Sequence, residues 1–151
     1  MSNHIEKIKN EKHIGKMFID GTITFDLLYD RKELLSLGDV VYFMISDNQV
    51  VKVGKAGGIH GFYSRMSQYK NGVDETNNRI IREAKNNNIT EVDIYIIECP
   101  REETTKKCIL TDAEISIEMP SNVGLEKYYM RLLGDYDEDL FFCNQLNKEG
   151  K

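Results

Sequence analysis

Apolar residues dominate three short, separated stretches of the chain, at residues 40–46, 50–54 and 92–98. Short apolar runs that are rich in β-branched and aromatic side chains and bounded by turn residues are typical of buried β-strands. Asp47 and Asn48 lie between the first two stretches, and both residue types favour tight turns. The pattern therefore predicts a β-hairpin over residues 40–54 and a third core strand that ends before Pro100.

A second hairpin is predicted nearer the start of the chain. Asp20-Gly21 lies between two apolar triplets, and Asp-Gly is among the strongest short-range signals for a hairpin turn. Residues 1–13 show no clean period, so we expect an arm that is disordered or loosely helical. Residues 101–107 are charged and irregular, whereas the alternation over residues 113–119 predicts an exposed strand.

Helical periodicity fills the intervals between these strands. Asp30 and Glu33 have the spacing of a capping box, and Gly38 is placed to end the short helix that follows. A later helix is expected to be capped by Ser121 or Asn122. The longer helices, including this last one at residues 125–134, are predicted over residues 62–69, 76–86 and 125–134. The chain is therefore expected to belong to the α+β class.

Composition is that of one soluble domain. The 151 residues, of which 40% are hydrophobic, suffice for one sizeable core. No apolar run is long enough for a membrane span, and the N-terminus is polar where a secretory signal would be apolar, so we expect a cytoplasmic protein. Cys99, Cys108 and Cys143 are widely spaced and odd in number, which argues against a disulfide framework or a zinc site and favours buried thiols.

Overall charge does not suggest a nucleic-acid partner, because the net charge of −5 is acidic. Charge is distributed unevenly, however. Residues 52–85 contain only Asp74, Glu75 and Glu83 as acids, whereas the basic residues of this segment are Lys52, Lys55, Arg65, Lys70, Arg79, Arg82 and Lys85. This segment is either a local phosphate-binding face or an ordinary solvated helical surface.

The first hairpin carries candidate chemistry. If residues 46–49 form the reversal, Tyr42 and Lys52 lie nearly opposite each other, within one pair of register, and share a face of the sheet. An ammonium beside a phenol favours the phenolate, so this pair is a potential base. The same residues also suit an ordinary strand and an edge-protecting lysine.

Two further charged side chains stand out downstream. Arg65 lies at the edge of an apolar helical stripe, where it either extends to water or, aimed into a cleft, binds an anion. Glu126 is expected in the first turn of the last long helix, where a glutamate commonly complements the helix dipole. Beyond that helix, residues 141–143 return apolar side chains to the core, and Asn144 follows them with an amide.

Taken together, these motifs resemble the GIY-YIG nuclease superfamily. The first signature falls on Val40-Val41-Tyr42 and the second on Lys52-Val53-Gly54, and the resemblance runs from about Gly38 to Asn147. Neither the glycine nor the isoleucine of the first signature is present, and Lys52 replaces the tyrosine of the second. This arrangement is similar to a type II restriction endonuclease variant in which lysine assists the remaining tyrosine. Tyr69, one turn after Arg65, is a second point of similarity to it.

The resemblance implies a fold and a set of roles. It implies a small three-stranded antiparallel sheet flanked by helices at residues 38–151, here with an N-terminal arm and hairpin at residues 1–37 packed on it. It also implies a metal-dependent DNA endonuclease. Tyr42, assisted by Lys52, would take a proton from water, Arg65 and Tyr69 would hold the scissile phosphate, Glu126 would bind a single Mg²⁺ or Mn²⁺, and Asn144 would orient the cleft wall. The side chains expected to contact DNA are Lys55, His60, Lys70, Arg79 and Arg82.

Two other functions stay open at this point. One is a catalytically inactive nucleic-acid-binding module on the same scaffold, and the other is a structural or protein-interaction domain. If the chain is a nuclease, double-strand cleavage needs two active sites, which suggests a homodimer or sequential nicking. Sequence specificity would have to come from the N-terminal arm and residues 101–119, or be absent.

Overall fold

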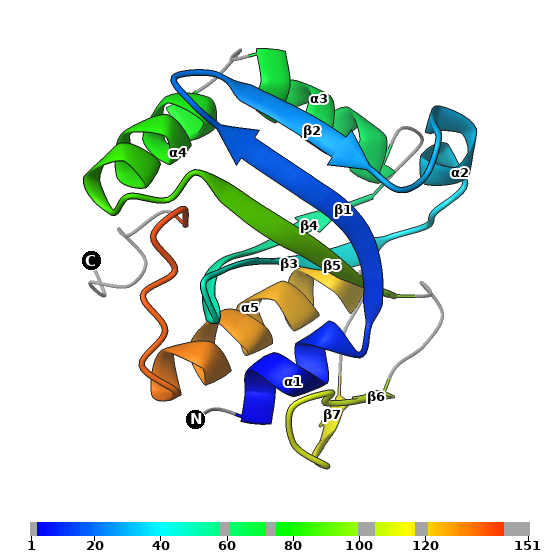
Figure 1. Cartoon of the computed structure of the whole chain (residues 1–151). Coiled ribbons are helices and arrows are strands. Elements are labelled where there is room, and N and C mark those ends of the chain that lie inside the picture. The colour runs from blue at the N-terminus through cyan, green and yellow to red at the C-terminus, as the bar shows by residue number, and fades with distance from the viewer. Residues whose placement is uncertain (1–2, 58–60, 72–74, 100–104, 117–120, 144–151) are drawn as a thin grey trace.

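A five-stranded antiparallel sheet forms the centre of the computed structural model, which describes residues 3–57, 61–71, 75–99, 105–116 and 121–143 (Figure 1). Its strand order is β2-β1-β5-β3-β4. The strands are β1 (Lys12–Ile19), β2 (Ile23–Leu27), β3 (Val40–Ser46), β4 (Gln49–Ala56) and β5 (Glu91–Glu98). A separate two-stranded sheet pairs β6 (Thr105–Lys107) with β7 (Glu114–Ser116).

The expectation of a three-stranded sheet is wrong in its strand number. β5 pairs with β3 along one edge and with β1 along the other, so the N-terminal hairpin completes the same sheet instead of packing beside it. The physical reason is visible in β5, whose interior side chains are almost all buried. A strand buried on both faces lies inside a sheet and needs hydrogen-bonding partners on both edges.

Both predicted hairpin turns are confirmed. Ile19 pairs with Ile23 around a loop in which Gly21 has φ of 74°. In the second hairpin Ser46 pairs with Gln49, and the turn residues Asp47 and Asn48 have φ of 53° and 62°. Positive φ at both central residues is the signature of the type I′ turn, whose twist matches that of the flanking strands.

The helices follow the sequence pattern closely. The helices are α1 (Asn3–Lys9), α2 (Arg31–Leu35), α3 (Gly61–Asn71), α4 (Glu75–Asn86) and α5 (Ser121–Asp135). The capping box of α2 is present, with Glu33 N–H donating to Asp30 Oδ1 (2.8 Å) and Asp30 N–H donating to Glu33 Oε1 (2.9 Å). The helix ends at Leu35, before Gly38.

Two segments are more regular than expected. The N-terminal arm contains the helix α1, whose Ile5 and Ile8 are buried. Part of the charged segment 101–107 forms β6, which pairs with β7, the strand expected over residues 113–119. The buried contacts of α1 come from residues far away in the sequence, and β6, although it pairs with the next strand β7, has no alternating apolar pattern, so the local pattern reveals neither element.

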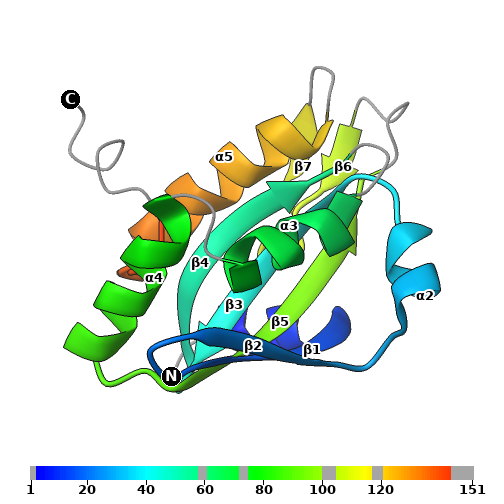
Figure 2. The ribbon, with the colours of Figure 1, turned by 90° about the horizontal axis from the view of Figure 1, so that it is seen from above.

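The sheet separates two hydrophobic clusters. Tyr42 and Met44 of β3 face α3 and α4, whereas Val41 and Phe43 face α1 and α5. Figure 1 shows α3 and α4 above the sheet and α1 and α5 below it, and Figure 2 shows the same layers from above. Side chains from α3 and α5 can therefore meet only around an edge of the sheet, and α5 packs against the edge strand β4.

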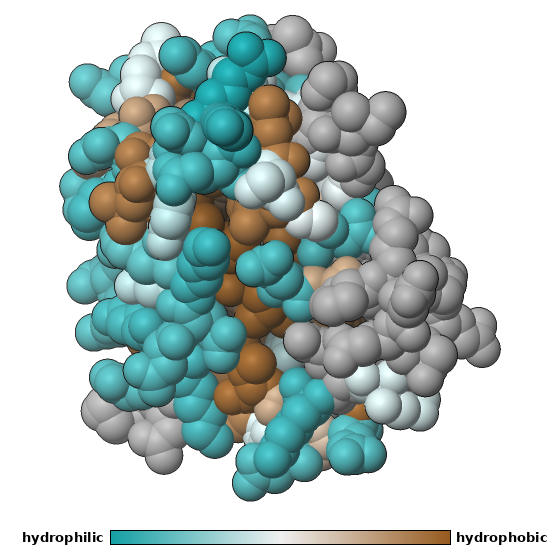
Figure 3. Space-filling view, turned by 90° about the vertical axis from the view of Figure 1, so that its right-hand side faces the viewer, coloured by the Kyte–Doolittle hydropathy of each residue, from teal (hydrophilic) through white to brown (hydrophobic). Residues whose placement is uncertain are grey.

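Apolar side chains are mostly inside. Among the described residues, the large hydrophobic side chains with high exposure are Leu28 (62%) and Tyr136 (37%). Figure 3 shows one face, on which a narrow apolar band lies between hydrophilic side chains. The three cysteines are buried thiols outside any disulfide, as the sequence predicts. None of the described helices is long and apolar enough to cross a lipid bilayer.

Candidate active site

A β-bulge in β4 determines which way Lys52 points. Ile45 pairs with Val50, but Met44 pairs with Lys52, so Val51 is an extra residue on β4. Without this residue Lys52 would lie opposite Phe43, on the other face of the sheet, because a shift of one residue reverses every side chain. The bulge therefore brings Lys52 to the Tyr42 face.

The expected register of Tyr42 and Lys52 is wrong in detail. Tyr42 pairs with Gly54 and Lys52 pairs with Met44, so the two lie two pairs apart. They share a face, as predicted, but not a cross-strand pair. The two-residue turn followed by the bulge produces this offset, and neither feature can be read from the alternation of apolar residues alone.

Tyr69 joins the two strands of this site to α3. The hydroxyls of Tyr42 and Tyr69 are hydrogen-bonded to each other. Two cations approach the Tyr69 ring, with Lys52 Nζ 5.9 Å and Arg65 Cζ 5.7 Å from its centroid. Arg65 Nη1 also donates to Gln68 Oε1 (3.0 Å) on the same helix. Tyr42, Lys52, Arg65 and Tyr69, which the sequence singles out, therefore lie together.

The Tyr42 phenol is protonated in this environment. Burial raises its pKa well above the ordinary value of 10.0, Tyr69 adds to this rise, and Arg65 opposes it. The expectation of a lowered pKa at Tyr42 is therefore not met in the free protein. The physical reason is that the side chain is fully buried (0% exposed), and desolvation disfavours the phenolate more than nearby cations favour it.

Gly54 leaves the space that Tyr42 occupies. A Cβ added at Gly54 would lie 2.7 Å from Cε1 of Tyr42 and closer still to its Cζ and hydroxyl oxygen. A glycine within a strand often marks a close approach of another group. The glycine at position 54 is thus explained by the phenol that lies across it.

Glu126 comes from the opposite side of the sheet. The helix α5 begins at Ser121, so Glu126 lies in its second turn, and the first turn contains no acidic residue. The expectation of a first-turn position is therefore wrong, because the helix starts earlier than its apolar stripe. Since the dipole effect falls off within the first turn, complementing the dipole does not explain this glutamate.

The carboxylate of Glu126 interacts electrostatically with the other candidate residues. Burial raises its pKa above 4.5, and this rise is opposed by Lys55, Lys52, Arg65 and Lys127, in that order. Glu126 in turn acts on Tyr42. Among the described residues it forms no hydrogen bond and no ion pair. Side chains of β3, β4 and α3 thus lie within electrostatic range of Glu126 on α5, which packs against the edge strand β4.

Removal of the Glu126 charge should stabilise the free protein. Because burial raises the folded-state pKa, the unfolded state ionises first as pH rises, and the carboxylate costs stability above that range. We expect Glu126→Gln to raise the melting temperature at pH 7 and to have no such effect at a pH below the unfolded-state pKa of about 4.3. Thermal unfolding at both pH values measures this, and Glu98→Gln, at an exposed position on β5, is the control.

Unchanged stability of Glu126→Gln at pH 7 would contradict a desolvated carboxylate. A stabilisation of the same size at both pH values would also contradict it, because the effect would then come from packing and not from the charge. Glu98→Gln should leave the melting temperature unchanged at both pH values, since exposed substitutions are usually close to neutral.

Glu126 suits a hard divalent cation. The described residues contain no cluster of three or more histidine, cysteine, aspartate or glutamate side chains, so an all-protein metal cage is absent from them. A single carboxylate without hydrogen-bond partners, partly buried, is the donor set that Mg²⁺ accepts when water and substrate oxygens complete its shell. Glu126 is therefore the residue that would hold such an ion.

The remaining predicted residues are distributed differently. Lys55 is partly buried and is the cation that most lowers the pKa of Glu126. Lys55 therefore belongs to the site itself more than to a peripheral DNA contact. Lys70 and Arg82 are exposed on α3 and α4, and Arg79 is partly buried on α4. His60 and Asn144 lie outside the described residues.

Lys127 was missed by the sequence reasoning. It is exposed and follows Glu126 directly, and its charge acts on that carboxylate. An isolated surface lysine has no signal in the sequence that separates it from the other lysines. Only its place beside Glu126 identifies it.

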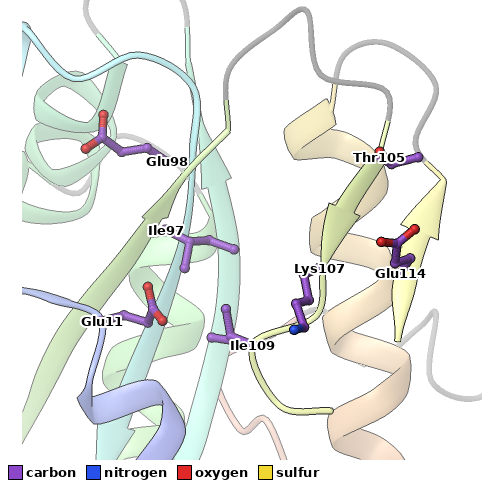
Figure 4. Close-up of a pocket in the computed structure, with 7 residues that line it drawn as sticks. All are labelled: Glu11, Ile97, Glu98, Thr105, Lys107, Ile109 and Glu114. Atoms are coloured by element: carbon purple, nitrogen blue, oxygen red, sulfur yellow. The ribbon is translucent and has the colours of Figure 1, made fainter. Parts of the chain in front are cut away.

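A pocket of about 300 Å³ lies elsewhere, between β5, β6 and β7 (Figure 4). It contains none of the candidate residues, and of its two apolar side chains Ile97 belongs to the cluster on the face opposite Tyr42 and Ile109 packs against that cluster. Three of its lining side chains are Glu11, Glu98 and Glu114. Their charges repel phosphate, so this pocket does not extend the basic site.

Comparison with known proteins gives no family assignment. No family model and no curated protein matches the chain. Among solved structures, a mutant of bacteriophage T4 EndoII is similar with TM-score 0.49 and 18% identity, over 87% of this chain and 95% of that one. Restriction endonuclease HPY188I in complex with product DNA is similar with TM-score 0.44 and 15% identity, over 85% and 79%. Both TM-scores are below 0.5, and neither similarity assigns a function to this chain.

Proposed function

We propose that the chain is a metal-dependent DNA endonuclease of the GIY-YIG type that hydrolyses phosphodiester bonds. The observation that carries this proposal is the clustering of Lys52 and Arg65 around Tyr69, whose hydroxyl is hydrogen-bonded to Tyr42, within electrostatic range of Glu126, on which Lys55 also acts. One lone carboxylate among several cations is a poor arrangement for stability alone. It suits a site that binds a phosphate and a metal ion together.

The cations supply the phosphate site in this proposal. Arg65 presents a planar fork of donors that matches a phosphodiester, and Lys52 and Lys55 add compact charges from β4. Tyr69 would donate its hydroxyl to the same phosphate. Residues 38–151 would form the nuclease domain on which residues 1–37 pack, and the exposed Lys70 and Arg82, with Arg79, would contact the DNA backbone further away.

Tyr42 would take the proton from the attacking water. Its phenolate is disfavoured by burial, and the groups that would stabilise it are Arg65, which lowers the pKa of Tyr42, and Lys52, which with Arg65 approaches the neighbouring Tyr69 ring. A Mg²⁺ or Mn²⁺ held by Glu126 would supply stabilisation of the charge that develops on the leaving 3′ oxygen. Each part of the reaction then has a named side chain.

One observation favours a second candidate function. Tyr42 is fully buried and its pKa is raised well above 10.0, which is unfavourable for a base at neutral pH. A catalytically inactive nucleic-acid-binding module would keep the same cations and the same scaffold without this chemistry. The two candidates differ in cleavage and agree in DNA binding.

Plasmid nicking tests the proposal directly. We expect the protein to convert supercoiled plasmid to the nicked form with Mg²⁺ or Mn²⁺ and not with EDTA. We expect Glu126→Ala to lose this activity while it still binds DNA in a salt-dependent manner, because its cations remain. Conversion to linear DNA by a homodimer, seen by sizing the active species, would show that both strands are cut in one assembly.

The control is Glu98→Ala, which removes an exposed carboxylate from the same sheet and should cut like the wild type. Salt-sensitive DNA binding without cleavage under any metal condition would select the inactive module. If the protein neither binds nor cleaves DNA, both functions are refuted.

A further inference from the structure

The bulge in β4 is held from outside the sheet. The N–H of Val50 donates to Glu138 Oε1 (2.8 Å), and the N–H of Phe142 donates to the carbonyl oxygen of Val51 (2.9 Å). Because β4 is an edge strand, these groups have no strand partner on that side. In Figure 1 the orange-to-red segment that follows α5 passes beside the turn end of the β3–β4 hairpin. This segment therefore fixes the backbone on both sides of the extra residue.

Glu138 also ties the bulge to the N-terminal helix. Its second carboxylate oxygen, Oε2, lies 2.6 Å from His4 Nε2 of α1. The His4 ring stacks on Tyr136 with 4.4 Å between centroids. Both Glu138 (9% exposed) and His4 (5% exposed) are buried, so each polar group depends on the other for its hydrogen bond. One carboxylate thus joins α1, the segment after α5 and β4.

We call the hydrogen bonds of Glu138 to Val50 and His4 the Glu138 clamp. This clamp matters because the register of β4 determines on which face of the sheet Lys52 lies. With Val51 as an extra residue, Lys52 lies opposite Met44 and reaches the Tyr69 ring. If β4 took the regular register, Lys52 would face the apolar cluster around Phe43 instead. The acceptor that Glu138 offers to Val50 N–H favours the bulged register, because that N–H is buried and must be paired.

We propose that Glu138 is a positioning residue for the candidate active site, acting through the β4 bulge on Lys52. The inference rests on the proposed nuclease function, which it extends to a residue that touches neither DNA nor metal. When the Glu138 clamp is lost, Lys52 moves away from Tyr69 and Tyr42, while the chain keeps the lysine and its charge.

The test compares Glu138→Ala with Asp139→Ala. Asp139 is the next residue, is exposed, and accepts a hydrogen bond from the Gln49 side chain (3.2 Å) at the same turn, so it is a matched control away from the bulge. Contact of Lys52 with Tyr69 is read by the nuclear Overhauser effect between the two side chains. Cleavage is read as kcat and KM separately on a plasmid or duplex substrate.

For Glu138→Ala we expect the Lys52–Tyr69 contact to be lost and kcat to fall on the order of 100-fold, as for a misplacement of about 1 Å. KM should stay close to that of the wild type, since Arg65 and Lys55 still hold the phosphate. Asp139→Ala should keep both the contact and the rate. Glu138→Gln, whose amide oxygen can accept from Val50 N–H and whose amide can donate to His4, should restore both.

Retention of the Lys52–Tyr69 contact in folded Glu138→Ala would overturn the inference, and so would a lost contact with unchanged kcat. If Glu138→Ala does not fold, Glu138→Gln decides, and failure of that variant to restore the contact refutes the positioning role. A wild type that does not cleave DNA refutes the proposed function instead, because the contact is measured without cleavage.

Discussion

Tyr42→Phe is expected to lower the rate of DNA cleavage by roughly 10²–10⁴-fold, the usual contribution of a general base. The substitution removes the hydroxyl and keeps the ring. The ring packs edge-on against Phe62 (5.8 Å between centroids) and Tyr69 (6.5 Å), and these contacts need no hydroxyl. Single-turnover cleavage of a duplex with Mg²⁺ measures the loss at the chemical step.

Folding should survive this substitution. The hydrogen bond between the two hydroxyls is lost, which costs on the order of 1 kcal/mol because Tyr69 is left with an unpaired buried hydroxyl. Tyr95→Phe is the control, because Tyr95 lies on β5 and faces the other cluster. It should cut at the wild-type rate. Cleavage by Tyr42→Phe at the wild-type rate would remove Tyr42 from the mechanism and leave another group as the base.

The sequence predicts elements whose cause is local. The turn at Asp47 and Asn48 and the capping box of Asp30 and Glu33 depend on residue types a few positions apart, and both are present. The stripe of α3 places Phe62, Met66 and Tyr69 in the core, as its spacing requires. Features of this kind need no knowledge of distant residues.

Long-range features were not predictable in the same way. The pairing of β1 with β5, which enlarges the sheet, depends on which free edge the hairpin meets. At the bulge, Val50 N–H donates to the Glu138 carboxylate and the Val51 carbonyl accepts from Phe142 N–H, and both partners lie far along the chain. A pattern of alternating residues does not contain either partner, so the predicted register of Lys52 was wrong.

The candidate site was predicted more by resemblance than by pattern. Tyr42, Lys52, Arg65, Tyr69 and Glu126 were singled out along the chain, and the structure brings them to one edge of the sheet. Their electrostatics could not be read from residue types. Burial of Tyr42 reverses the expected direction of its pKa, and burial is a property of the packed fold.

Gly54→Ala should impair cleavage as severely as many active-site substitutions. An alanine Cβ would overlap the phenol of Tyr42, so the ring must move. We expect a rate loss on the order of 100-fold from the displaced hydroxyl, and a destabilisation of roughly 1–3 kcal/mol from overpacking. Cleavage kinetics and urea unfolding measure the two effects separately. A variant that cuts normally would show that the Tyr42 hydroxyl does not need its present position.

Gly134→Ala is the matched control for this substitution. Its added Cβ meets nothing within 4 Å, and Gly134 lies in the last turn of α5, so cleavage should be unchanged and stability should not fall. A double variant then isolates the cause. If Gly54→Ala acts only by displacing the Tyr42 hydroxyl, adding it to Tyr42→Phe should lower the rate no further, because coupled residues are not additive. A further loss would show that Gly54 serves the site through another group as well.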